Sequence, residues 1–382
     1  KEGVTQGDPL SMYAYALALL PLVKKLEERT AGVQVWYADD SGIADNLPNI
    51  QKWLDELCSL GPGYGYFPEP EKCILVSSIN PRTEEFKEKN NLKKVVTGYR
   101  YLGGPIGTQE YTENYCQDKL ADWKKELETF VPIARLVPHE VYTAITKSLK
   151  HRWTFNLRAT QVDPEKCKEI DEFITGPLLD ALLRTKVDDT TRNLSNIRAK
   201  NGGLGLPHLR TTAETQYKTS KLATEHLIES IVRRKELCSA THYRKGSEAR
   251  KNNNLHTEEQ EKLRFQEAVK GLPNTRKRII ERAPLTGIWL SQYPATDNGN
   301  VLSPEEFRDS ILTRYGETPE NLQPHCDGCG KKSTLDHLLT CKTGGLVHQA
   351  HDELRDELAT LAKQAYLPSA VQLEPPIRNN SD

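Results

Sequence analysis

The sequence has very little methionine and no long apolar stretch. Met12 is the single methionine among 382 residues, and aromatic residues make up 7%. The longest apolar run, Met12–Val23, contains Pro21 and is twelve residues long, whereas a membrane-spanning helix needs about 20. No charged segment followed by an apolar core and a small-residue cleavage site opens the chain, so nothing indicates secretion. Because the chain starts with Lys1, we expect it to be an excerpt of a longer protein.

The sequence also lacks an excess of charge of either sign. It has 52 Lys and Arg against 53 Asp and Glu, a net charge of −1. Two stretches are locally basic, Arg233–Lys251 and Lys147–Arg158, and the second also contains Trp153 and Phe155. A solvated helix face is the simplest interpretation of such a charge run. The interleaved aromatic residues instead favour a partner with a phosphate backbone.

The spacing of apolar residues predicts an α+β fold for the first part of the chain. Residues 9–30 have helical spacing up to Pro21, which should end or kink the helix. Residues 33–43 indicate a strand, a polar turn and a second strand, and 99–107 indicate another strand and turn. We therefore expect an antiparallel sheet packed with helices over residues 1–107.

Beyond residue 112 the spacing predicts helices as far as residue 232, broken by a glycine loop at 201–207. Residues 240–262 are polar and basic, and we interpret them as a flexible linker. An amphipathic helix with Leu354, Leu358 and Leu361 precedes a polar tail.

Two adjacent carboxylates lie in Tyr37-Ala38-Asp39-Asp40, between the two predicted strands. On a tight hairpin one side chain can face a cleft and bind a divalent cation while the other supports the turn. Carboxylate oxygens suit magnesium, and two such ions can stabilise the attacking and leaving oxygens of a phosphoryl displacement. Aspartate is also a preferred turn residue, so an ordinary solvated hairpin is the alternative.

A loop containing glycine precedes the first predicted helix. Pro9 suits the first helical position and Asp8 suits the N-cap, so a capped helix is one interpretation. Gln6 and Gly7 would also let the backbone approach a base or nucleotide closely. Asp39 follows Asp8 by only 31 residues, which brings the loop and the carboxylates into one region of the chain.

These motifs, taken in order, resemble the palm of reverse transcriptases from non-LTR retrotransposons. The matching segments are Gln6-Gly7-Asp8-Pro9-Leu10-Ser11, Tyr37-Ala38-Asp39-Asp40, Pro70-Glu71-Lys72-Cys73, Tyr101-Leu102-Gly103-Gly104 and Gly202-Gly203-Leu204-Gly205-Leu206. Five ordered matches over about 200 residues are more specific than any single motif. The resemblance implies a partial polymerase palm, an all-helical thumb and RNA-directed DNA synthesis.

The resemblance also implies roles for individual residues. It assigns magnesium or manganese to Asp39 and Asp40, and the departing pyrophosphate to Lys72, for which a plain surface lysine is the alternative. The remaining roles are the nucleotide pocket (Gln6, Gly7, Asp8, Pro9), the primer grip (Leu102, Gly103, Gly104) and duplex contacts of the thumb (Lys147, Lys150, Arg152, Arg158). Trp123 and Trp153 would either contact the duplex or belong to the core.

One departure from the family is serious. The family carries another metal-binding aspartate on a strand upstream of the Gln-Gly-Asp-Pro loop, and only Lys1–Thr5 precede that loop here. We therefore expect this chain not to polymerise unaided.

A compact group of metal-ligand residues follows at Cys326-x2-Cys329-x7-His337-x3-Cys341. Three thiolates and one imidazole suit a closed, structural zinc site. His325 is a competing imidazole, although it lies too close to Cys326 in the chain for comfortable chelation. A chance cluster of reduced thiols is the alternative. By resemblance, a similar knuckle follows the polymerase in retrotransposons that carry a restriction-like endonuclease.

The last segment, His351-Asp352-x2-Arg355-Asp356 with Glu374-Pro375, resembles the entry to that nuclease. An amphipathic helix with charge pairs is the preferred interpretation. The predicted domains are a partial palm (1–111), a helical thumb (112–239), the flexible basic linker (240–262), a helical region (263–324), the zinc knuckle (325–345) and the start of a nuclease-like domain (346–382).

The sequence thus predicts a portion of an RNA-directed DNA polymerase. Its partners would be an RNA template, a DNA primer or target and deoxynucleoside triphosphates, with no membrane and no small-molecule redox cofactor. The family implies a nuclear location. A non-catalytic, zinc-containing nucleic-acid-binding remnant and a nuclease are the rival hypotheses.

Overall fold

The computed structural model describes residues 7–319, 322–343 and 346–373. Gln6 and the Glu374-Pro375 pair therefore lie outside the described residues. The fold is mostly helical with small two-stranded sheets, and it divides into two compact units. The first unit comprises Lys1–Leu127, Lys147–Phe173 and Pro207–Gln260, and the second comprises Glu128–Thr146, Ile174–Leu206 and Glu261–Asp382.

In the described part of the chain, the first unit contains six strands, which form three separate pairs. They are β1 (Val33–Tyr37), β2 (Asp40–Ala44), β3 (Ile74–Val76), β4 (Lys94–Val96), β5 (Gly98–Tyr101) and β6 (Gly104–Gly107). The pairs β1–β2 and β5–β6 are antiparallel, whereas β3–β4 is parallel. The expected single antiparallel sheet is therefore wrong for β3–β4. A helix connects these two strands, and a crossover of that kind allows parallel pairing.

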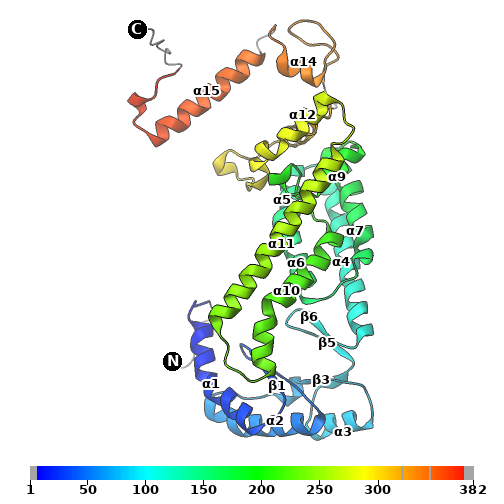
Figure 1. Cartoon of the computed structure of the whole chain (residues 1–382), viewed down its shortest axis with the longest axis vertical. Helices are drawn as coiled ribbons and strands as arrows, with labels where there is room; N and C mark the ends of the chain where they lie inside the picture. Colours follow the sequence, from blue (N-terminus) through cyan, green and yellow to red (C-terminus); the bar gives the residue numbers. More distant parts are fainter. Residues whose placement is uncertain (1–6, 320–321, 344–345, 374–382) are drawn as a thin grey trace. The chain divides into compact units, whose positions relative to one another are not determined.

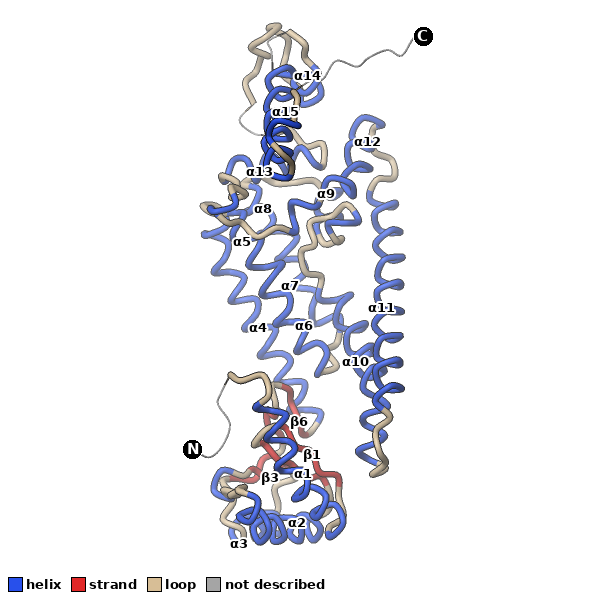
Figure 2. Tube along the Cα trace, turned by 90° about the vertical axis from the view of Figure 1, so that its left-hand side faces the viewer, coloured by secondary structure: helices blue, strands red, loops and turns tan. Residues whose placement is uncertain are grey.

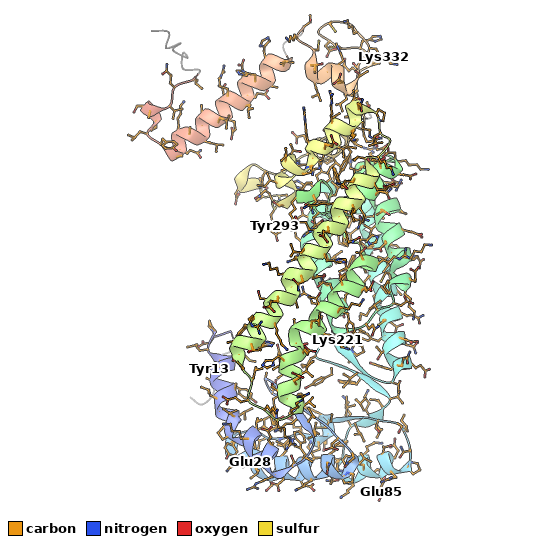
Figure 3. All side chains as sticks on the ribbon, viewed as in Figure 1. Tyr13, Glu28, Glu85, Lys221, Tyr293 and Lys332 are labelled. Atoms are coloured by element: carbon orange, nitrogen blue, oxygen red, sulfur yellow. The ribbon has the colours of Figure 1, made fainter. Side chains whose placement is uncertain are left out.

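Helices make up the rest of the first unit, and Figure 2 shows the strands in red beside α1 and α2. The helices are α1 (Ser11–Arg29), α2 (Leu47–Leu60), α3 (Pro81–Lys89), α6 (Lys150–Ala159), α7 (Lys168–Phe173), α10 (Leu209–Val232), and most of α4 (Gln109–Ala134) and α11 (Ser239–Ala268). One core cluster joins α1 to α2 through Leu19, Leu22, Leu26, Trp53, Leu54 and Leu57. Trp123 and Trp153 are buried and stack with ring centroids 5.6 Å apart, so they belong to the core.

The start of the first helix differs from the sequence-based expectation. α1 begins at Ser11 and continues through Pro21, because burial of its apolar stripe against α2 offsets the cost of the proline. Asp8 is not the N-cap of this helix. Its carboxylate accepts a hydrogen bond from the Leu10 backbone N–H at 2.8 Å, which forms an Asx turn one step before the helix.

The long helix α11 replaces the flexible linker predicted at 240–262, so that prediction is wrong. Most of its residues are Ala, Leu, Glu, Gln, Lys and Arg, which favour helix strongly enough to outweigh Gly246 and three consecutive asparagines. The helix also packs on α10, since Lys245 lies 3.8 Å from Glu225 of that helix. Figure 1 shows α10 and α11 side by side in the first unit.

The second unit contains several short helices, a longer helix and a largely buried loop. Its helices are α5 (Pro138–Ala144), α8 (Leu179–Leu183), α9 (Asp189–Ser195), α12 (Asn274–Arg282), α13 (Pro304–Arg314), α14 (Leu335–Thr340) and α15 (Leu346–Ala365). The loop is the glycine segment 202–206. The Tyr142 hydroxyl donates to the Leu204 carbonyl at 2.7 Å, and the Tyr315 hydroxyl donates to the Gly202 carbonyl at 3.2 Å. These bonds satisfy carbonyl groups that the loop would otherwise bury unpaired.

Candidate functional site

The two adjacent carboxylates lie at the tip of a tight hairpin, as the sequence predicts. Tyr37 at the end of β1 pairs with Asp40 at the start of β2, so Ala38 and Asp39 alone form the turn. Ala38 has φ 53°, a left-handed conformation that is uncommon outside glycine. The side chains of Asp39 and Asp40 are both exposed, which leaves their oxygens accessible to a ligand.

Tyr66 fixes the tip of this hairpin from the loop after α2. Its hydroxyl donates to the Asp39 backbone carbonyl at 3.0 Å and lies 2.9 Å from Ser41 Oγ. Its ring packs edge-on against Trp36 of β1 at 5.2 Å. Burial, assisted by the charges of Asp39 and Asp40, raises the pKa of Tyr66 although its hydrogen bond with Ser41 acts in the opposite direction. Tyr66 is therefore a neutral hydrogen-bonding group near pH 7.

The predicted primer-grip segment forms a second hairpin, β5–β6, beside the first. Leu102 has φ 46° and Gly103 has φ 86°, the pair of left-handed residues that a tight two-residue turn requires. A Cβ atom added to Gly42 of β2 would lie 3.6 Å from the Tyr101 hydroxyl oxygen. The structure thus brings the hairpin of Asp39 and Asp40 into contact with the hairpin of Tyr101.

Helices hold the turn of the second hairpin in place. The Tyr115 hydroxyl of α4 donates to the Gly103 carbonyl at 3.0 Å. The ring of Phe155 on α6 lies so near that a Cβ on Gly103 would be 2.9 Å from it. Glycine is needed at position 103 for both its backbone conformation and this close approach.

A third tyrosine, Tyr15 of α1, completes the surroundings of the carboxylates. Burial raises the pKa of Tyr15, and Tyr66 and Asp39 add to the effect. Burial likewise raises the pKa of Tyr101, with Asp40 as the next cause. The sequence did not single out Tyr15 or Tyr66. Tyr101 lies in a motif that the sequence did identify, but the sequence assigned it no role.

The predicted magnesium site consists of the carboxylates of Asp39 and Asp40 alone in the described part of the chain. Within residues 7–319, 322–343 and 346–373, no cluster of three or more potential metal ligands includes Asp39 or Asp40. Carboxylate oxygens are donors of the kind that magnesium prefers, and two of them alone would leave most of its coordination positions to water or to other ligands.

Lys72 is an exposed lysine next to the strand β3. Its ammonium group forms an ion pair with Glu69 at 2.5 Å, and that hydrogen bond raises the pKa of Lys72. A raised pKa makes the ammonium a weaker proton donor, so the charge of Lys72 is more useful than its proton.

The predicted duplex-binding residues lie in or near α6. The Arg152 guanidinium donates to Glu126 of α4 at 2.7 Å, and Arg158 donates to Gln216 of α10 at 2.9 Å. Both arginines remain exposed, whereas Lys147 and Lys150 are half-buried. The two arginines thus tie α6 to its neighbouring helices, in addition to any contact with a ligand.

A Cys3His cluster that could hold zinc forms in the second unit, from the residues that the sequence predicts. The ligand atoms of Cys326, Cys329, His337 and Cys341 all lie within 4.8 Å of one another. The Cys326 and Cys341 sulfurs are 3.7 Å apart, and Cys329 Sγ is 3.1 Å from His337 Nε2. Two sulfurs of a tetrahedral zinc site with Zn–S bonds of about 2.3 Å are about 3.8 Å apart. The cluster therefore fits a zinc ion, and His325 is not part of it.

A tight turn and a short helix bring the ligands of this Cys3His cluster together. The Gly330 backbone N–H donates to the Cys326 carbonyl at 2.8 Å, which closes a tight turn between the first two thiols. Thr334 caps α14, and this short helix carries His337 toward the other ligands. Backbone hydrogen bonds from Cys329 and Gly328 lower the pKa of the Cys326 thiol to about 6, which favours the thiolate form that binds metal.

Comparisons with known proteins leave the family of this chain open. No protein-family model matches the chain, and no curated protein matches it. Among the described residues, no helix combines the length and the apolar character needed to cross a bilayer.

Proposed function

We propose that this chain is a portion of an RNA-directed DNA polymerase of the non-LTR retrotransposon kind, acting in the nucleus on an RNA template and a DNA primer. The supporting observation is the contact between two hairpins that the sequence separates by about 60 residues. Tyr101, at the primer-grip turn, lies against Gly42, directly behind the Asp39–Asp40 tip. A polymerase needs its primer end held beside its metal-binding carboxylates, and this contact joins the two parts.

Each part of the chain has a defined task in this proposal. The turn Leu102–Gly104 orients the primer end, and α4 and α6 hold that turn through Tyr115 and Phe155. Asp39 and Asp40 would hold magnesium, which would supply the positive charge that stabilises nucleotidyl transfer. Gly7, Asp8 and Pro9, which precede α1, would line the nucleotide pocket.

Lys72 would neutralise the departing pyrophosphate. It would have to leave Glu69 to do so, and an exposed ion pair of this kind is weak enough to exchange partners. Arg152 and Arg158 would contact the backbone of the duplex from the exposed side of α6.

Primer extension by the protein as its gene encodes it tests this proposal. The assay supplies an RNA template, a labelled DNA primer, deoxynucleoside triphosphates and magnesium. We expect Asp39→Asn and Asp40→Asn each to abolish extension while Asp118→Asn, an exposed aspartate of α4, leaves it unchanged. Full activity in both hairpin variants would contradict the assignment.

The rival function is a non-catalytic, zinc-containing nucleic-acid-binding remnant. The exposure of both carboxylates and the absence of a third carboxylate near them, among the residues that the structure describes, favour it. The same experiment separates the two functions. A protein that binds the RNA–DNA duplex but never extends the primer, at any magnesium concentration, is the remnant.

A further inference from the structure

The Tyr101 hydroxyl is the polar group that the site described above leaves unexplained. Its oxygen is buried and has no hydrogen-bond partner in the described part of the chain. A buried donor without an acceptor lowers the stability of the fold, so native proteins keep few of them. Phenylalanine would fill the same space against Gly42 without this cost.

The nearest strand indicates which acceptor the hydroxyl can reach. Side chains two residues apart on a strand point to the same face. Asp40 and Gly42 both belong to β2, and the Cβ direction of Gly42 points toward the Tyr101 hydroxyl at 3.6 Å. The side chain of Asp40 therefore leaves β2 on the face that Tyr101 covers.

The hydroxyl of Tyr66, the other polar group near Tyr101, already has hydrogen-bond partners. The Tyr66 hydroxyl donates its proton to the Asp39 carbonyl and contacts Ser41 Oγ. The carboxylate of Asp40 is exposed, and its charge acts on the Tyr101 hydroxyl. Asp40 is thus an acceptor within electrostatic reach that can turn inward by side-chain rotation.

We propose that Tyr101 is a positioning residue whose hydroxyl donates a hydrogen bond to the Asp40 carboxylate when that side chain turns in from solvent. This inference rests on the proposed function, because it concerns the orientation of a metal-binding carboxylate. One carboxylate oxygen is then held by Tyr101, and the other is left for a divalent cation. Since Tyr101 ends β5 just before the primer-grip turn, the hydrogen bond also links the primer-holding hairpin to the metal-binding hairpin.

Manganese binding to the zinc-loaded chain tests the inference without relying on activity. Free Mn²⁺ is followed by electron paramagnetic resonance during titration of wild type, Tyr101→Phe and Tyr99→Phe. Tyr99 is a matched control because it lies on the same strand two residues earlier. Loss of a group that orients a metal ligand weakens metal binding by about tenfold or more. We expect that loss in Tyr101→Phe and none in Tyr99→Phe.

Two further measurements distinguish positioning from a structural role. The thermal unfolding midpoint of Tyr101→Phe should equal or exceed that of wild type, because the variant removes a buried unpaired donor. In an Asp40→Asn background, Tyr101→Phe should have no further effect on Mn²⁺ affinity, because the metal-binding carboxylate that the hydroxyl would orient is already absent.

Equal Mn²⁺ affinity in wild type and Tyr101→Phe would overturn the inference, as would a lower unfolding midpoint with unchanged affinity. Wild type that binds Mn²⁺ no better than the double variant Asp39→Asn/Asp40→Asn would refute the metal site itself. If Mn²⁺ binds and responds to Tyr101→Phe but primers are never extended, the proposed function fails while the inference holds.

Discussion

Asp39 and Asp40 are neighbours in sequence but have different surroundings. The backbone carbonyl of Asp39 is tied to Tyr66, whereas Asp40 begins β2 and shares a face with Gly42. Tyr66 therefore fixes where the turn lies, and Tyr101 affects how the carboxylate of Asp40 is oriented. The two neighbouring residues thus differ because Asp39 belongs to the turn, whereas Asp40 is the first residue of β2.

His139 should make the stability of the second unit depend on pH. Its buried ring stacks on Phe307, and its Nδ1 accepts a hydrogen bond from the Leu302 backbone N–H at 3.3 Å. Burial lowers the pKa of His139 below its ordinary value of 6.5. The unfolded chain therefore binds a proton first as the pH falls. The buried neutral ring of His139 therefore stabilises the folded protein fully only above about pH 6.5. That contribution to the free energy of unfolding is lost as the pH drops through the lower pKa that His139 has in the folded protein.

Urea unfolding at pH 7.5, 6 and 5, followed by tryptophan fluorescence, measures this effect. Trp289 is a convenient reporter because its ring lies 6.5 Å from that of His139. The variant His139→Gln keeps a hydrogen-bond acceptor and cannot titrate, so its stability should fall less over the same range. Parallel curves for the two proteins would contradict the role of His139.

Gly203 should tolerate no side chain. A Cβ there would lie 1.9 Å from the Ile197 carbonyl oxygen and 2.5 Å from that of Leu194. Gly203→Ala must push the backbone apart, and we expect it to destabilise the protein by about 3 kcal/mol or more. Gly63→Ala is the control, since no atom lies within 4 Å of its added Cβ, and it should change stability by less than about 0.5 kcal/mol. Thermal unfolding measures both, and equal midpoints would refute the expectation.

Among the secondary-structure elements, the two antiparallel hairpins and α11 depend on tertiary contacts in different ways. Each hairpin is a local structure that a two-residue turn defines, and the position of one against the other depends on Tyr101 and on the helices α4 and α6. The helix α11 shows the opposite case. Its residues lack an apolar face of their own, yet packing on α10 completes a helix where polarity suggested a linker.

Gly246 tests whether α11 is a helix in solution. It lies inside the helix, where alanine is favoured over glycine by about 0.5–1 kcal/mol. An added Cβ would meet the flexible Arg250 side chain at 3.4 Å and the Ala223 carbonyl at 3.5 Å. We expect Gly246→Ala to raise the unfolding midpoint.

Gly271→Ala is the matched control, because position 271 has φ 80° and open space around it. This substitution should lower stability by about 1 kcal/mol through backbone strain alone. In a flexible linker, Gly246→Ala would leave the midpoint unchanged, and that result would contradict the helix.

At the scale of the whole molecule, the chain forms two compact units that are interleaved in sequence. The chain crosses between the units five times, and α4 and α11 each extend across a crossing. The predicted boundaries at 111 and 239 followed changes in composition along the chain. The compact units instead follow contacts between segments distant in sequence, such as α10 with α6 in the first unit.

Zinc removal should affect only a small part of this molecule. The four ligands of the Cys3His cluster lie within sixteen residues, whereas the core formed by α1 and α2 consists of other residues. Structural zinc supplies folding free energy locally. We therefore expect a chelator to speed amide exchange in Cys326–Cys341 by at least about a hundredfold and to leave Leu22 and Leu26 unchanged.

Hydrogen exchange read by mass spectrometry tests this expectation, together with zinc content. Cys329→Ser should lose zinc and show the same local exchange without a chelator. Cys58→Ser, which alters an exposed thiol of α2, should retain zinc. Equal zinc content in the two variants would end the assignment of this site.

The local features of this protein follow from short stretches of its sequence. The residue spacing of Cys326, Cys329, His337 and Cys341 was sufficient to predict the cluster, because all four ligands belong to one short segment whose turns bring them together. The hairpin of Asp39 and Asp40 was likewise predictable from its short turn. Three features emerged only from the three-dimensional fold: Tyr101 covers Gly42, Trp123 and Trp153 stack in the core, and residues 240–262 are helical. Each of these depends on contacts between distant segments, and no local pattern of side chains encodes which segments meet.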